Sequence, residues 1–166
     1  SLLYLYSFLK PHFEVQIVDL ETEIGRPNSS VNIKRFKDKA KTLLSQKSFD
    51  LVGISCWTSL SYQACIAVGS VIKEINPYST IVVGGYHPSA VPDDFTYPGS
   101  PFDFLVIGEG EQAFLKICKG EMDKKEQTTI ISGDSGNLEN FPFLDLSPMG
   151  TGKNPQGRFI YPFYLY

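Results

Sequence analysis

Short apolar segments alternate with helical patterns along most of this chain, and this alternation is the strongest constraint on its fold. The apolar segments lie at 14–20, 51–55, 80–83 and 102–107. Residues 33–44 and 60–75 instead repeat apolar side chains every three or four positions, which is the spacing of one helix face. Strands that alternate with helices form β-α-β units and a parallel sheet. The sequence therefore predicts an α/β fold, a Rossmann-like (flavodoxin-like), doubly wound parallel sheet with helices on both faces.

The chain opens on a helical pattern rather than on a strand. Its first apolar residues, among them Leu2, Leu5 and Leu9, have the spacing of a helix face. A doubly wound domain normally opens on a strand, usually a central one. We therefore expect that this first strand is missing from the chain. We also expect that the gap beside 51–55 stays open or is closed by another copy of the chain, rather than filled by 158–166.

A change of composition near residue 134 predicts a domain boundary. Residues up to 133 carry the strand and helix patterns, including a short strand at 128–132, whereas 134–157 is rich in glycine and proline. An apolar group at 141–144 provides an anchor within this linker, and 158–166 is apolar and aromatic again. We expect one domain at 1–133, followed at 134–166 by a linker and the start of a further domain.

Charge and composition exclude several classes of function. The 166 residues carry a formal net charge of −3, which excludes the strongly basic surface of a nucleic-acid-binding domain. No stretch approaches the roughly 20 apolar residues of a membrane helix, and no secretory signal is present. The three cysteines are too few and too scattered for a disulfide framework or a closed zinc site. We expect a cytoplasmic domain with no metal ligands of its own and no nucleic-acid or membrane partner.

Three loops at the predicted carboxyl ends of strands form the candidate binding site. They begin at Ser-Cys-Trp-Thr (55–58), Gly-Gly-Tyr-His-Pro (84–88) and Gly-Glu-Gly-Glu (108–111). Ligands of open parallel sheets bind at this edge, and small residues let a bulky ligand approach the backbone. The candidate cofactor-binding residues are Ser55, Trp57, Thr58, Gly84, Gly85, Tyr86, His87, Gly108, Glu109 and Gly110.

These residues admit other interpretations. Residues 108–113 fit the pattern of a dinucleotide-binding loop, but they follow the last strand, and two glutamates would lie where a pyrophosphate must bind. Trp57 is equally compatible with core packing and with a flat surface for a ligand, and His87 with a ligand contact and with an ordinary loop position. No Ser/His/Asp constellation can be assembled, so no catalytic residue is assigned.

Four strings of the sequence resemble a known family when they are taken in this order and spacing. They are 2–5 through 19–20, Asp-Leu-Val-Gly-Ile-Ser at 50–55, Val-Gly-Gly-Tyr-His-Pro at 83–88, and 103–111 with its Gly-Glu-Gly-Glu. Together they resemble the amino-terminal cobalamin-binding domain of cobalamin-dependent radical S-adenosylmethionine (SAM) enzymes, the group that includes anaerobic magnesium-protoporphyrin IX monomethyl ester cyclases. The resemblance covers about residues 1–120, and 141–146 resembles the linker before the radical SAM domain.

The resemblance implies a module that holds cobalamin over the carboxyl-end loops. Ser55 and Thr58 would match the hydroxyl site near the nucleotide tail of the cofactor, Gly84 and Gly85 would make room for that tail, and 108–111 would form the rim. The full-length protein would carry a carboxyl-terminal radical SAM domain with a 4Fe-4S cluster and SAM. This chain alone is then not expected to catalyse a reaction.

Two family motifs are absent, and two alternative functions stay open. The chain has no Asp-x-His-x-x-Gly, so no histidine ligand below the cobalt is assigned, and no Cys-x-x-x-Cys-x-x-Cys for a cluster. One alternative is a flavodoxin-like interaction or receiver-type signalling module, although the acceptor-aspartate and lysine positions of a receiver hold Ser55 and Gly108-Glu109. The other is a degenerate domain that keeps the fold and binds no cofactor.

Overall fold

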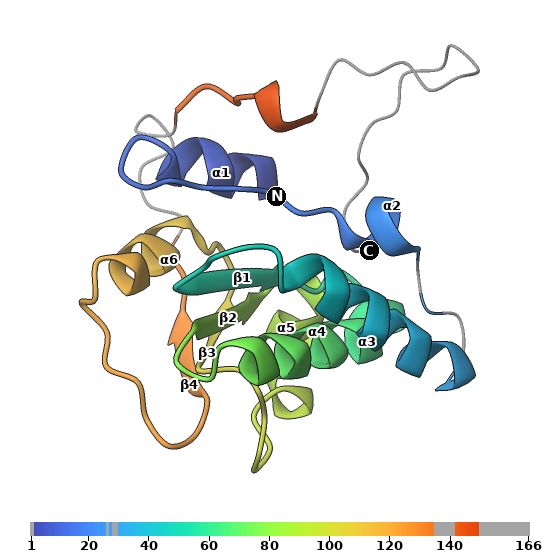
Figure 1. Cartoon of the computed structure of the whole chain (residues 1–166). Helices are drawn as coiled ribbons and strands as arrows, with labels where there is room; N and C mark the ends of the chain where they lie inside the picture. The colour runs from blue at the N-terminus through green and yellow to red at the C-terminus, as the bar shows by residue number, and fades with distance from the viewer. Residues whose placement is uncertain (1, 26, 28–29, 135–141, 150–166) are drawn as a thin grey trace.

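A four-stranded parallel sheet forms the centre of the computed structural model, which describes residues 2–25, 27, 30–134 and 142–149. Its strands occur in the order β1-β2-β3-β4 and are all parallel (Figure 1). Their bounds are β1 Leu51–Ser55, β2 Thr80–Gly84, β3 Phe104–Ile107 and β4 Thr129–Ser132. The α/β class, the parallel pairing and the short fourth strand are thus confirmed.

Helices cover both faces of the sheet, as predicted. α1 and α6 lie on one face, and α3 and α4 lie on the other (Figure 1). The α-helices are α1 Leu2–Leu9, α2 Leu20–Ile24, α3 Ser30–Leu44, α4 Tyr62–Ile75, α5 Tyr86–Ala90 and α6 Glu111–Cys118. Short 3-10 turns are η1 Ser59–Ser61, η2 Pro92–Asp94 and η4 Ser147–Met149. No helix among the described residues combines the length and apolar character that crossing a bilayer requires.

Two apolar cores lie on opposite faces of the sheet, and β1, β2 and β3 contribute to both. In β2, Ile81 and Val83 pack into the core beneath α3 and α4, whereas Val82 packs with Phe104 and Phe114 on the side of α1 and α6. Successive side chains of a strand point to opposite faces. A strand buried on both faces therefore needs apolar residues at nearly every position, which explains the continuous apolar segments.

The predicted strand at 14–20 is wrong. Residues 14–19 belong to no strand, and Leu20 instead begins α2. The side chain of Asp19 caps that helix by accepting a hydrogen bond from the amide of Thr22 at 3.1 Å. Val15 packs against the core beside α1 and α6, and Val18 against the core beside α3 and α4. The apolar pattern of this segment therefore reflects burial against two cores rather than pairing in a sheet.

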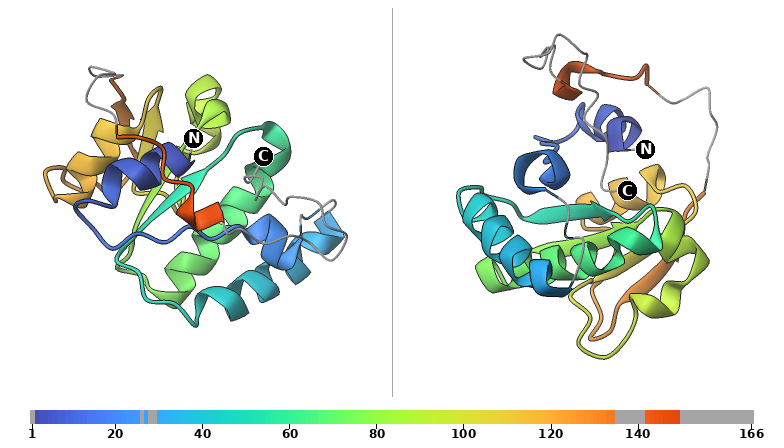
Figure 2. Two further views of the ribbon diagram at one scale, coloured as in Figure 1. Left: turned by 90° about the horizontal axis from the view of Figure 1, so that it is seen from above. Right: turned by 90° about the vertical axis from the view of Figure 1, so that its right-hand side faces the viewer.

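The segment at 142–149 contacts α1 although it lies far from it in sequence (Figure 2). The amide of Asp145 donates a hydrogen bond to the hydroxyl of Ser7 at 2.7 Å, and the Asp145 carboxylate pairs with Lys10. Lys10 and then the hydrogen bonds from Ser147 lower the pKa of Asp145 to about 2. The ion pair is therefore complete above the ordinary pKa of an aspartate and is lost as the pH falls toward 2.

The strand expected at 158–166 lies outside the described residues. The expectation that this segment leaves the gap beside 51–55 unfilled therefore stays a prediction.

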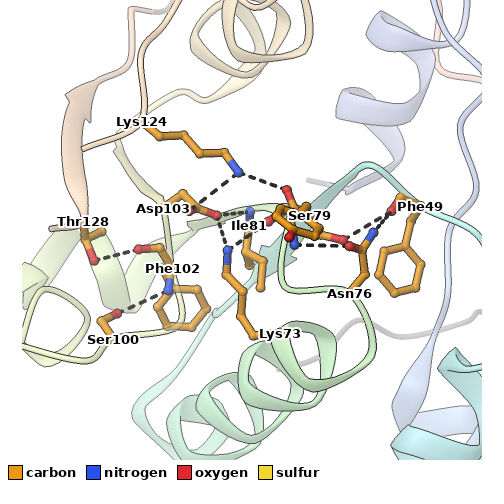
Figure 3. Close-up of polar contacts among 11 residues, drawn as sticks. Phe49, Lys73, Asn76, Ser79, Ile81, Ser100, Phe102, Asp103, Lys124 and Thr128 are labelled. Atoms are coloured by element: carbon orange, nitrogen blue, oxygen red, sulfur yellow. Dashed lines mark hydrogen bonds and ion pairs between the residues drawn. The ribbon is translucent and has the colours of Figure 1, made fainter. Parts of the chain in front are cut away.

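Asp103 joins the amino-terminal ends of β2 and β3 (Figure 3). Its Oδ2 accepts hydrogen bonds from the Ile81 amide at 2.7 Å and from Nζ of Lys73 at 2.8 Å. Lys73 also donates to the carbonyl of Ser79 at 2.9 Å, so α4 is tied to the same corner. Lys124 approaches Asp103 only to 3.8 Å. The Asp103 side chain is largely buried, so these hydrogen bonds face little competition from water.

We expect Asp103→Ala to lower the free energy of unfolding by about 2–3 kcal/mol, because the Ile81 amide and the Lys73 ammonium lose a charged acceptor. Urea denaturation followed by circular dichroism measures this change. Lys124→Ala is the matched control, with an expected loss below about 1 kcal/mol because that pair is long and the Lys124 side chain is exposed. Equal losses in the two variants would contradict the assigned role of Asp103.

Candidate functional site

Small residues occupy neighbouring positions on one face of the sheet, near the carboxyl ends of its strands. The register pairs Ser55 of β1 with Gly84 of β2, and Gly53 with Val82. Alternate residues of a strand face the same side. Gly53, Ser55 and Gly84 therefore face α1 and α6, as Val82 does. Two glycines and a serine supply almost no side-chain volume on a face that is otherwise filled by valine and phenylalanine.

A cavity of about 130 Å³ lies over Ser55 and Gly84. The space at Gly53 is filled by the ring of Phe114, which would lie 2.7 Å from a Cβ on Gly53. The floor of the cavity is the sheet from Gly53 to Gly84, and α1 contributes Leu2 and Leu5 on the opposite side. The remaining lining residues are Ile54, Ser55, Val82, Gly85, Val106, Gly108, Glu109, Gly110, Glu111 and Phe114. The cavity thus reaches from the sheet face to the carboxyl-end loops, which is the edge where ligands of open α/β sheets bind.

Gly84 and Gly85 are glycine for different reasons. Gly85 has φ +110°, and a Cβ there would lie 2.8 Å from the carbonyl oxygen of Cys56, so its own backbone excludes a side chain. A Cβ on Gly84 would meet the carbonyl oxygen of Val106 at 3.5 Å, which is ordinary contact. The local backbone therefore tolerates a side chain at Gly84, and its absence keeps the cavity open.

The loop at 108–110 brings a buried carboxyl group to the cavity through Glu111, the first residue of α6. Glu111 is only 7% exposed, and its Oε2 has no hydrogen-bond partner among the residues that the structure describes. Glu109, two residues earlier, is exposed. Glu111 belongs to the candidate loop at 108–111 but was not among the ten candidate residues, because the sequence does not show that its carboxyl group is buried.

Six of the ten predicted site residues line the cavity: Ser55, Gly84, Gly85, Gly108, Glu109 and Gly110. The ring of His87 lies elsewhere. Its Nε2 is 2.9 Å from Oδ2 of Asp94, and the rings of Tyr62 and Phe95 have centroids 5.7 and 5.4 Å away. Phe95 belongs to the core on the side of α3 and α4. The structure therefore uses the His87 side chain to join α5 to the turn at Asp94, not to line the cavity.

The other three predicted residues surround the carboxyl edge without lining the cavity. Trp57 and Tyr86 are 50% and 70% exposed, and their ring centroids are 5.6 Å apart. They form an aromatic pair beyond the ends of β1 and β2. Oγ1 of Thr58 is buried without a hydrogen-bond partner among the described residues. The sequence left two interpretations of Trp57 open, and this exposed position favours the ligand-surface interpretation over core packing.

The cysteines have the properties of structural thiols. Cys56 and Cys65 are both buried, and a hydrogen bond with Cys56 together with burial raises the pKa of Cys65. Burial raises the pKa of Cys118 to about 11. A thiol with a raised pKa is a poor nucleophile at neutral pH. Among the described residues, no group of three or more histidine, cysteine, aspartate or glutamate side chains could hold a metal ion.

The chain is similar to known proteins over most of its length. The family model of the B12 binding domain matches residues 1–117. An uncharacterized methyltransferase of Pyrococcus horikoshii is 28% identical over 146 residues, which is 86% of this chain and 29% of that protein. A 2-(S-pantetheinyl)-carbapenam-3-carboxylate methyltransferase of Streptantibioticus cattleyicolor is 30% identical over 86 residues, which is 52% of this chain and 12% of that protein. No solved structure gives a significant match.

The two adjacent glycines should respond oppositely to alanine. We expect Gly85→Ala to lower the free energy of unfolding by about 2 kcal/mol or more, because the new Cβ meets the Cys56 backbone at a positive φ. Gly84→Ala should stay within about 1 kcal/mol of the parent. Thermal and urea denaturation of both variants measure these changes, and a Gly84→Ala variant as unstable as Gly85→Ala would contradict the different roles of these two glycines.

Proposed function

The chain belongs to the B12-binding domain family, and on that premise we propose that it holds cobalamin at the carboxyl-end edge of its sheet. The observation that carries this proposal is the cavity beneath α1, which exists because Ser55 and Gly84 add little side-chain volume to the sheet face. A structural core would fill such a face with apolar side chains. An open cavity at the ligand-binding edge of the fold is instead suited to receive part of a large cofactor.

The residues present fit such a cofactor in two respects. Gly84 lies where a side chain would enter the cavity, and we assign it and Ser55 to the site of the nucleotide tail. The exposed rings of Trp57 and Tyr86 offer flat apolar surface at the same edge, which suits the corrin ring. When bound, cobalamin supplies a cobalt centre that can carry a methyl group. The residues of this chain bind and orient the cofactor, and we assign none of them a catalytic role.

We further propose that the domain presents cobalamin to a radical SAM domain that carries a 4Fe-4S cluster and SAM. The support is the resemblance of 50–55, 83–88 and 103–111 to the amino-terminal domain of the cyclase group. The chain spans less than a third of the length of each curated relative that it matches, and both of those proteins are named methyltransferases. We therefore assign the reaction of the whole protein to its other domains.

Filling the cavity should block cobalamin without unfolding the domain. We expect Gly84→Leu to lose uptake of hydroxocobalamin, because its side chain would occupy the space above β2. Visible absorption after incubation and gel filtration measures uptake, and circular dichroism measures folding. Gly85→Leu is unsuitable for this purpose, since the Cys56 backbone excludes any side chain there whether or not a ligand binds.

The matched control is Gln46→Leu, which adds a similar side chain at an exposed position far from the cavity. It should take up as much cobalamin as the parent. Equal uptake by a folded Gly84→Leu variant would contradict the assignment of the cavity. Absence of uptake by the parent would favour the degenerate domain that keeps the fold and binds no cofactor.

The radical SAM context has a separate test in the gene. We expect the coding sequence that flanks this region to encode a strand before residue 1 and a Cys-x-x-x-Cys-x-x-Cys motif after residue 166. Anaerobic reconstitution of the complete protein with iron and sulfide should then give the absorption of a 4Fe-4S cluster near 400 nm. A complete gene without the cysteine motif would refute this part of the proposal while leaving cobalamin binding intact.

A further inference from the structure

The buried carboxyl group of Glu111 differs from the other acidic groups near the sheet. Asp103 accepts from Lys73 and from the Ile81 amide, and Asp94 pairs with His87. Glu111 is more than nine-tenths buried and lines the cavity, yet its Oε2 has no hydrogen-bond partner among the described residues. Buried polar groups in native structures nearly always have a partner, so an exception requires a physical explanation.

The position of Glu111 does not by itself explain the unpartnered oxygen. A carboxylate in the first turn of a helix is favoured by the helix dipole, but an exposed side chain gains this benefit without losing water. Glu109 is an exposed acidic residue in the same loop. Burial of Oε2 without a donor lowers the stability of the ligand-free domain. A donor on a bound ligand would supply the missing hydrogen bond.

We propose that Glu111 accepts a hydrogen bond from a hydroxyl group of the nucleotide tail of cobalamin, an inference that rests on the proposed function. An ionised carboxylate only accepts hydrogen bonds, so its complement must be a donor. The phosphodiester of the tail offers only acceptor oxygens, whereas its ribose carries hydroxyl donors, so we assign the ribose to the part of the cavity beside α6. Glu111 is thus a positioning residue that selects which part of the tail lies beside α6.

The test compares Glu111→Met and Glu111→Gln with the parent chain against two ligands. Hydroxocobalamin carries the nucleotide tail, whereas cobinamide retains the corrin ring and its amide groups but lacks the tail. We expect Glu111→Met to bind hydroxocobalamin at least about tenfold more weakly, because a hydrogen bond to a charged acceptor is lost. Glu111→Gln keeps a neutral acceptor and should lose less. Cobinamide should bind all three proteins equally, and equilibrium dialysis with absorbance detection measures each affinity.

The ligand-free stability separates this role from a structural one. Because Oε2 has no partner in the free domain, Glu111→Met should unfold at the same temperature as the parent or higher. Glu126→Met removes the same charge from an exposed position and should change neither stability nor affinity.

Three outcomes would overturn the inference. Unchanged hydroxocobalamin affinity in a folded Glu111→Met variant would contradict the proposed hydrogen bond. An equal loss for cobinamide would assign the donor to the corrin amides instead of the tail. A parent chain that binds neither ligand would overturn the proposed function itself, and the inference with it.

Discussion

The in-register pairing of β1 with β2 is the constraint on which the candidate site depends. It sets Ser55 beside Gly84, so the missing side-chain volume of two strands accumulates in one place. Backbone hydrogen bonds continue the pairing past the strand ends: the amide of Cys56 donates to the Gly84 carbonyl at 2.8 Å, and the His87 amide donates to the Cys56 carbonyl at 3.1 Å. A shift of one residue would turn the small residues toward the opposite core and close the cavity.

Much of this arrangement could be predicted from the sequence, because burial on both faces leaves a strong pattern. Strands β1, β2 and β3 are nearly continuous apolar runs, each followed by small residues, and these positions were identified correctly. The carboxyl ends of parallel strands meet at one edge, so Ser55, Gly84 and Gly108 could be grouped without coordinates. Periodicity and topology were sufficient for these parts of the fold and of the site.

The wrong strand and the misassigned site residues have one physical cause. A sequence pattern indicates that a residue is buried, but it does not indicate which residues bury it. Val15 and Val18 are apolar because two cores use them, and no neighbouring strand among the described residues pairs with that segment. His87 follows β2, as predicted, but its ring lies beside Asp94 instead of lining the cavity. Glu111 was passed over because an unpartnered buried oxygen is a property of three-dimensional packing.

The contact between α1 and the segment at 142–149 has a consequence for ligand affinity. α1 supplies Leu2 and Leu5 to the cavity. Ser7 of the same helix and Lys10, which follows its last residue, both contact Asp145. The segment at 142–149 is thereby linked through α1 to one wall of the cavity. If a ligand moves α1 relative to that segment, the contact with Asp145 weakens, and the free energy of that loss reduces the ligand's affinity.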